Sequence, residues 1–353
     1  MHFQLGVIEG FYGRQWSWAQ REQLPALLAA WGYNAYIYAP KGDSSLRSAW
    51  HQPFSRVHQY QLSAMSEACH QAGIAWGLGF SPAGLQTRFD AADRQRLAAK
   101  VDTLKALVLD QLWILFDDLP AGNPDLARRQ LDVVDFIRQQ MPNTQLAVCP
   151  SYYSEDPILE QLFGACPTGY FEELGAGLAE DIDILWTGRA VISPDYSAED
   201  MDRARLILGR KPLLWDNYPV NDGRKSSRFL NLYPFRGRGA SLAAQTRGHF
   251  TNPMNQFAAS CLVLPTLAAI YKNDEPYWAD QQFEQQLSTL PEVLAQRLRV
   301  DWSLFQEQGL DQIPESDKNK LCSAYRAISH PIAVEVADWL DEAYRFDPDC
   351  LTE

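Results

Sequence analysis

The chain has 353 residues, of which 46% are hydrophobic and 21% charged, a length that fits one large barrel of about 250 residues with an extension of about 100. Its formal net charge of -13 opposes binding to nucleic acid or to an anionic membrane surface, because like charges repel. No apolar run approaches the roughly 20 residues that cross a bilayer, and the first residues lack the basic region of a secretory signal, so we expect a soluble, cytoplasmic protein.

Short apolar runs alternate with amphipathic stretches over the first 270 residues, which is the pattern of repeated βα units. We expect strands at residues 4–9, 35–39, 75–80, 112–116, 145–149, 182–186, 212–215 and 249–251. We expect helices at residues 16–30, 60–72, 91–109, 125–140, 156–163, 198–209, 239–245 and 255–271. Because eight parallel strands close a barrel, the predicted fold class is α/β, a (β/α)8 TIM barrel with a C-terminal helical extension.

The alternation stops near residue 273, and the rest of the chain has a helical pattern. Helices are expected at residues 283–297, 302–308 and 317–346, with breaks at Pro276, Pro291 and Pro314. We therefore divide the chain into a catalytic barrel, residues 1–273, and a helical extension, residues 274–353. The extension packs on the barrel or on a second subunit, which makes it a candidate homodimer interface.

The six cysteines are widely spaced and form no Cys-x-x-Cys pair, so we expect neither a zinc cage nor a disulfide framework. The six histidines include no pair four residues apart, the spacing that places two metal ligands on one helix face. The sequence therefore predicts no metal site.

Two adjacent carboxylates, Asp117 and Asp118, directly follow the apolar run at residues 112–116. In barrels of this kind, catalytic residues collect at the carboxyl ends of the strands, so the pair indicates acid/base chemistry. The alternative is that one Asp caps the next helix and the other is solvated.

The predicted strand ends bring acids, amides, a lysine and many aromatic rings to one rim. A sugar needs this combination, since its C–H faces stack on aromatic rings while its hydroxyls need hydrogen-bond partners. Each residue alone has a simpler interpretation, such as a turn glycine or a core tryptophan, so the inference depends on their co-location.

Neighbouring carboxylates on one chain do not readily flank a glycosidic bond, as the two carboxylates of an ordinary glycosidase must. They suit substrate-assisted hydrolysis, in which the acetamido oxygen of a 2-N-acetyl sugar is the nucleophile. One Asp then holds the acetamido N–H, and the other protonates the leaving oxygen.

Six motifs resemble glycoside hydrolase family 84, which contains the protein O-GlcNAcases and bacterial β-N-acetylglucosaminidases. They are GVIEGFYGR at residues 6–14, YAPK at 38–41, FDD at 116–118, LWTG at 185–188, WDNYPVND at 215–222 and TNP at 251–253. Their order is that of the family. The resemblance implies a retaining exo-β-N-acetylglucosaminidase that hydrolyses terminal β-linked GlcNAc through an oxazoline intermediate without a cofactor. The implied partners are GlcNAc-bearing glycosides, glycopeptides or glycoproteins, and neither nucleic acid nor membrane.

The resemblance implies that Asp117 orients and polarises the acetamido group, and that Asp118 is the general acid that later serves as base. We expect this coupled pair to hold one proton near neutral pH. The implied ligands of the sugar hydroxyls are Gly10, Lys41, Asp222 and Asn252. The residues implied to surround the N-acetyl group are Cys149, Tyr153, Thr187, Val191, Trp215 and Asn217.

Two positions depart from the family pattern. Tyr152 stands where the family commonly has an acid, and Gly42 stands where the family usually continues with acids after Lys41. The first departure puts substrate affinity in question. Two alternative functions stay open: an endo-acting hyaluronan or chitin hydrolase, which would consume long polymers, and a non-catalytic GlcNAc-binding barrel, which would bind without turnover.

Overall fold

The structure is a computed structural model that describes residues 3–272 and 276–348. In these two ranges, eight parallel strands close a barrel in chain order, and β8 pairs with β1. The strands are β1 (Gln4–Glu9), β2 (Ala35–Tyr38), β3 (Ala75–Phe80), β4 (Gln111–Leu115), β5 (Gln145–Cys149), β6 (Asp183–Trp186), β7 (Leu213–Asp216) and β8 (Gly248–Thr251). The predicted (β/α)8 barrel is confirmed, and each predicted strand agrees with the observed one to within one residue at either end.

The strands are apolar because both of their faces are covered, one by the barrel interior and the other by the helices. Trp113 on β4 packs edge-on against Phe250 on β8, with ring centroids 4.6 Å apart. Gly6 on β1 leaves room for this pair, since a Cβ there would lie 2.1 Å from the Phe250 ring. Aromatic rings thus fill the centre of the barrel below the strand ends.

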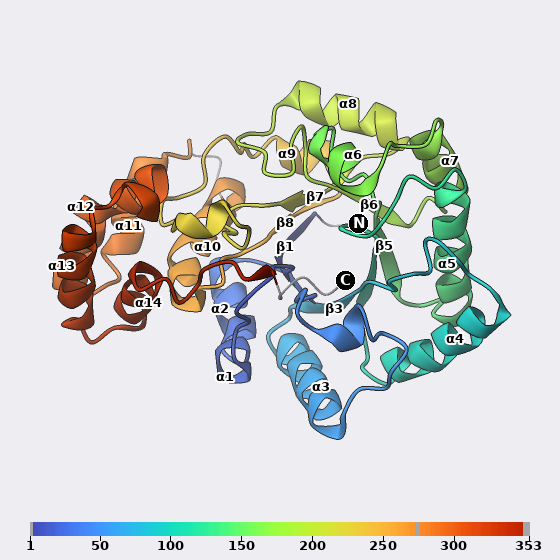
Figure 1. Ribbon diagram of the computed structural model, residues 1–353, viewed down its shortest axis with the longest axis horizontal. Helices are drawn as coiled ribbons and strands as arrows, with labels where there is room; N and C mark the ends of the chain where they lie inside the picture. Colours follow the sequence, from blue (N-terminus) through green and yellow to red (C-terminus); the bar gives the residue numbers. More distant parts are fainter. Residues whose placement is uncertain (1–2, 273–275, 349–353) are drawn as a thin grey trace.

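Helices surround the barrel (Figure 1). They are α1 (Trp18–Arg21), α2 (Leu24–Trp31), α3 (Arg56–Gln71), α4 (Ala91–Lys105), α5 (Leu126–Gln140), α6 (Ile158–Phe163), α7 (Tyr170–Gly177), α8 (Ala198–Leu208), α9 (Leu242–Gln245) and α10 (Phe257–Lys272). The single helix predicted at 16–30 is wrong: the chain forms two helices, and Pro25 lies in the first turn of the second, where its missing N–H costs nothing. Helix α7 was not predicted.

The C-terminal helices lie to one side of the barrel (Figure 1). They are α11 (Ala279–Leu287), α12 (Glu292–Ser303), a π-helical turn at Leu304–Gln308, α13 (Glu315–Arg326) and α14 (Pro331–Leu340). The helix predicted at 283–297 is wrong because Pro291 starts a new helix. The helix predicted at 317–346 is also two helices, since Pro331 lacks the N–H that a continuous helix requires.

The extension is joined to the barrel at the start of α10. The buried Glu335 carboxylate, on α14, accepts hydrogen bonds from the backbone N–H groups of Ala258 (3.0 Å) and Ala259 (2.9 Å). These are donors of the first helical turn that no intrahelical carbonyl can satisfy. Burial raises the pKa of Glu335 to about 7. The predicted boundary at residues 273 and 274 lies outside the described residues, and the division into two units stays a proposal.

Among the described residues, no helix combines the length with the apolar character that crossing a membrane demands.

Candidate active site

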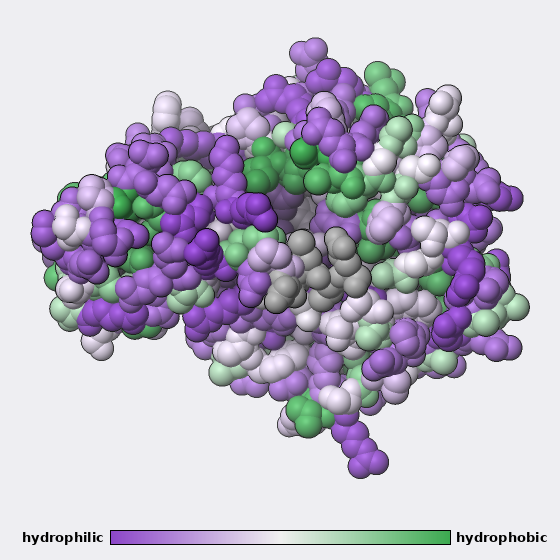
Figure 2. Space-filling view, in the orientation of Figure 1, coloured by the Kyte–Doolittle hydropathy of each residue, from purple (hydrophilic) through white to green (hydrophobic). Residues whose placement is uncertain are grey.

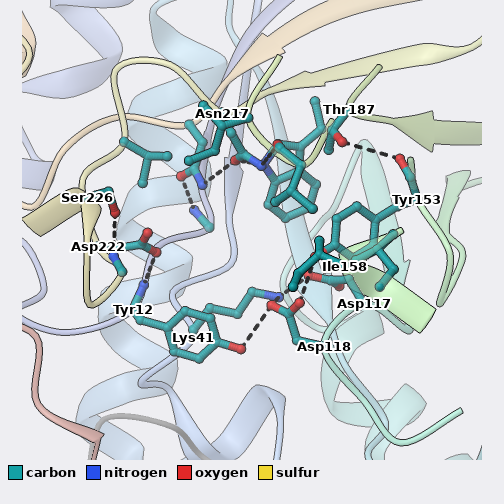
Figure 3. A pocket seen from close by; sticks show the side chains of 18 of the residues that line it. Tyr12, Lys41, Asp117, Asp118, Tyr153, Ile158, Thr187, Asn217, Asp222 and Ser226 are labelled. Atoms are coloured by element: carbon teal, nitrogen blue, oxygen red, sulfur yellow. Dashed lines mark hydrogen bonds and ion pairs between the residues drawn. The ribbon is translucent and has the colours of Figure 1, made fainter. Parts of the chain in front are cut away.

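A cavity of about 820 Å³ opens at the carboxyl ends of the strands. All twelve residues selected from the sequence line it, and Figure 3 shows several of them turned toward one another. They are Gly10, Lys41, Asp117, Asp118, Cys149, Tyr153, Thr187, Val191, Trp215, Asn217, Asp222 and Asn252. The expectation that the strand ends form one pocket is met for all strands but β3, whose end is absent from the described lining.

Asp117 lies directly beyond β4 and is buried. Its Oδ2 accepts a hydrogen bond from Lys41 Nζ, so the carboxylate is paired with a buried cation. Its Oδ1 is also buried but has no hydrogen-bond partner among the described residues. Because a buried acceptor without a partner is costly, this oxygen marks a place where a ligand's N–H or O–H group would be stabilised.

Both carboxylate oxygens of Asp118 accept hydrogen bonds. Tyr12 donates its hydroxyl hydrogen to Oδ2 (3.0 Å), and Tyr153 donates to Oδ1 (2.8 Å). Lys41 Nζ lies 3.8 Å from Oδ2. The backbone of Asp118 has a φ of +56°, a left-handed conformation that a residue with a Cβ adopts rarely and that is often found at functional sites.

The alternative interpretation of the pair, a helix cap with a solvated neighbour, is wrong. Helix α5 begins eight residues after Asp118, and its N-cap residue is Asp125. Both members of the pair instead line the cavity and contact Lys41.

Burial acts to raise the pKa of Asp118. The positive charges of Lys41 and Arg47 and the hydrogen bonds from Tyr153 and Tyr12 act in the opposite direction, and they hold this pKa below its ordinary value. Asp118 is therefore ionised at neutral pH in the free site. The pair was expected to hold one proton near neutral pH, and this direction argues against Asp118 as its carrier before a substrate binds.

A chain of amides forms the wall at β7, β8 and β1. Asn252 accepts a hydrogen bond from the Gly10 N–H (3.1 Å) and donates to Asn217 Oδ1 (3.1 Å). Trp215 Nε1 donates to the same oxygen of Asn217 (2.9 Å), and Asn217 Nδ2 donates to Val191 O (2.8 Å). A Cβ at Gly10 would lie 2.4 Å from the Trp215 ring. This wall is thus fixed before any ligand enters.

Asp222 lies in the segment that follows β7, and its Oδ2 accepts a hydrogen bond from the Tyr12 N–H (2.8 Å). Burial raises the pKa of Asp222 to about 6. On the other side of the cavity, Thr187 N–H donates to Tyr153 O (2.9 Å), which ties the ends of β5 and β6 together.

Tyr152, the replacement for a common acid of the family, does not belong to the described cavity lining. Its hydroxyl donates to Gly164 O (2.7 Å), and its ring packs edge-on against Tyr170. The replacement therefore supports the segment behind the cavity. Gly42 is the second departure from the family pattern. A Cβ at this position would lie 2.3 Å from Gln15 Nε2, so any other residue would displace the Gln15 side chain.

The cavity also contains residues that the sequence did not single out. Tyr12 belongs to the first motif, so its place in the motif was the available signal. Arg47, whose Nη2 donates to Asp118 O (2.9 Å), lies in an irregular turn without periodicity. Phe346 lines the cavity from the C-terminal segment, and no local pattern links it to the barrel.

Comparisons with known proteins agree with this geometry. The family model described as beta-N-acetylglucosaminidase matches residues 5–301. The chain is 32% identical over 286 residues to the protein O-GlcNAcases of Rattus norvegicus and Mus musculus. That match covers 77% of this chain and 30% of each relative, so the chain corresponds to less than a third of their length.

Solved structures share the fold. A mutant of the Thermobaculum terrenum O-GlcNAc hydrolase superposes with a TM-score of 0.79 at 27% identity, covering 97% of this chain and 81% of that one. The structure of CpGH84B superposes with a TM-score of 0.76 at 22% identity, covering 96% and 66% of the two chains; at that identity the likeness concerns the fold alone.

Proposed function

The chain belongs to the β-N-acetylglucosaminidase family, glycoside hydrolase family 84, and on this premise we propose that it is a retaining exo-β-N-acetylglucosaminidase using substrate-assisted catalysis. The family resemblance found in the six motifs is confirmed by the match over residues 5–301. The proposed substrates carry terminal β-linked GlcNAc, in keeping with the O-GlcNAcases that the chain resembles.

The observation that carries the proposal is the state of Asp117. One of its oxygens is paired with Lys41, and the other is buried at the cavity without a partner among the described residues. An acetamido N–H placed there would donate to the free Oδ1. The negative charge would then stabilise the positive charge that develops on the acetamido group as its oxygen attacks the anomeric carbon.

Asp118 is the proposed acid and base. In the first step it gives a proton to the glycosidic oxygen while the acetamido oxygen forms a bond to the anomeric carbon. The bond from that carbon to the glycosidic oxygen breaks, which releases the aglycone as its alcohol and leaves a protonated oxazoline, the oxazolinium ion. In the second step Asp118 takes a proton from water as the water oxygen attacks the same carbon and the ring opens. Two displacements retain the β configuration.

The free site favours the ionised carboxylate of Asp118, so on this proposal the carboxyl group is protonated in the complex with the substrate. A bound sugar removes water from the carboxylate and strengthens the effect of burial, which raises its pKa. The hydroxyls of Tyr12 and Tyr153 oppose that rise and stabilise the carboxylate that the second step needs.

We expect Tyr153→Phe to move the high-pH limb of the kcat profile, at which Asp118 in the enzyme–substrate complex loses its proton, to higher pH. The Tyr153 hydroxyl lowers the pKa of Asp118, so its removal favours the protonated acid. The measurement is kcat at saturating substrate against pH for an aryl β-GlcNAc glycoside. Tyr152→Phe is the matched control, since that hydroxyl donates to Gly164 O. A limb that stays in place or moves to lower pH would contradict this role of Tyr153.

Matched β-GlcNAc and β-glucose aryl glycosides test the proposed function directly. We expect release of the aryl alcohol from the GlcNAc compound alone, because glucose has no acetamido group to act as nucleophile. A thiazoline analogue of the oxazoline should inhibit the reaction. Absence of cleavage by the folded protein would favour the non-catalytic alternative, and consumption of long hyaluronan or chitin chains would favour the endo-acting one.

A further inference from the structure

Exposed apolar side chains line one part of the cavity mouth, whereas carboxylates and amides line the floor. Ile158 and Leu162 on α6 and Ile192 in the segment after β6 line the mouth, and Leu162 and Ile192 are 66% and 51% exposed. Figure 2 shows apolar surface beside the hollow at the centre of the barrel. Large apolar side chains exposed in a concave surface indicate a binding surface.

The role of the mouth follows from the proposed function, on which this inference rests. An exo-acting enzyme holds the terminal sugar at the polar floor, between the Asp117–Asp118 pair and the amide wall. The aglycone, which is the group linked to that sugar, must then extend from the floor through the mouth. Figure 3 places Ile158 beside Tyr153 and the aspartate pair.

Phe346 lines the same cavity from the end of the chain. It is held by the segment after β7, residues 222–228, which we call the β7 loop. The Phe346 N–H donates to Ser227 Oγ (3.3 Å), and Trp339 Nε1 donates to Ser227 O (3.1 Å). Arg228 on the same loop pairs with Glu342 (3.0 Å). Glu342 and Phe346 both contact the β7 loop, and these two contacts hold Phe346 in place at the cavity.

The β7 loop connects this C-terminal attachment to the sugar site. Asp222 at its start accepts a hydrogen bond from the Tyr12 N–H, and Arg224 and Ser226 of the loop line the cavity. The mouth therefore combines apolar side chains with a few polar groups. A peptide presents the same combination, since its backbone needs hydrogen bonds while its side chains can be apolar.

We propose that Phe346 is a specificity-determining residue that binds an apolar side chain next to the glycosylated residue of a peptide substrate. The ring occupies the wall formed by the C-terminal segment, and Ile158, Leu162 and Ile192 supply further apolar surface of the mouth. The C-terminal extension thereby contributes to the substrate site of its own chain.

The test uses two peptides that each carry one β-GlcNAc-serine, one flanked by leucines and the other by serines. We expect Phe346→Ala to raise KM for the leucine peptide about five- to tenfold, the loss expected from one partly buried apolar side chain, and to lower the preference for leucine over serine by the same factor. Phe346→Leu should keep most of the preference. Tyr60→Ala is the control, because Tyr60 on α3 is 75% exposed and lies outside the described lining.

Four outcomes distinguish a failure of this inference from a failure of the proposed function. Failure of the wild type to cleave an aryl β-GlcNAc glycoside would remove the proposed function. Wild-type activity with the same peptide preference in Phe346→Ala would overturn the inference alone. An equal loss on both peptides and on thiazoline binding would show that Phe346 acts through the β7 loop, which also overturns it. A loss confined to long-chain alkyl glycosides would assign the mouth to a different aglycone and would overturn the peptide assignment.

Discussion

Asp118→Asn is expected to abolish hydrolysis of GlcNAc glycosides with poor leaving groups and to retain measurable activity on activated aryl glycosides. An amide cannot protonate the departing oxygen, and general acid catalysis contributes typically 10²- to 10⁴-fold. An alkoxide therefore leaves very slowly, whereas an acidic phenol leaves as its anion without help. The loss should be largest for glycosylated serine and smallest for dinitrophenyl glycosides.

The measurement is kcat/KM against the pKa of the leaving group. The wild type should show a shallow dependence, and Asp118→Asn a steep one, because negative charge then accumulates on the departing oxygen. Asp156→Asn is the matched control: Asp156 also lines the cavity, but its carboxylate accepts hydrogen bonds from the Val191 and Ile158 N–H groups. Equal losses on good and poor leaving groups would contradict the acid role of Asp118.

The strands were predictable because burial on both faces requires a short continuous run of apolar residues, which is visible in the sequence. The predicted bounds of β1, β3 and β5 match the observed ones, and those of the other five strands differ by one position at most. Helix breaks were harder to predict. Pro25 and Pro331 each start a new helix, but an amphipathic pattern continues across them. Tertiary packing then decides whether one helix bends or two helices form.

The lining residues were predictable to the extent that they directly follow strands. Asp117, Asp118 and Asn217 each lie within three residues of a strand end, and a parallel barrel brings all such ends to one face. The orientation of their side chains was not predictable. The left-handed backbone at Asp118 and the Asp117 oxygen that lacks a partner among the described residues have no local mark in the sequence. The groups that contact the pair, Lys41 and two tyrosines, come from the segments after other strands.

Phe346 shows a second limit of sequence reasoning. The helical pattern predicted that the extension packs on the barrel or on a partner, but not which residue would reach the cavity. Phe346 is attached through Ser227 and lies beyond α14. Contacts between segments so far apart in the chain are determined by the packing of the whole molecule, and a single sequence carries no local mark of them.

Asp117→Asn is expected to lower kcat/KM about 10²- to 10³-fold, the cost of removing one preorganised electrostatic contact to a transition state. The variant side chain can still accept the acetamido N–H, but it lacks the charge that stabilises the developing oxazolinium. It also removes the charged partner that Asp117 provides for Lys41 in the wild type. Because bond cleavage depends on attack by the acetamido oxygen, activated and poor leaving groups should suffer alike.

Fluorination of the N-acetyl methyl group provides an independent test of the same step. Each fluorine makes the acetamido oxygen a weaker nucleophile, so the wild-type rate should fall steadily from acetyl to trifluoroacetyl substrates. Wild-type rates that do not respond to fluorination, or normal turnover by Asp117→Asn, would mean that the acetamido group is not the nucleophile. The steep dependence on the leaving group should belong to Asp118→Asn, and the uniform loss to Asp117→Asn. That contrast would assign different roles to two carboxylates that are adjacent in the chain and share contact with one lysine.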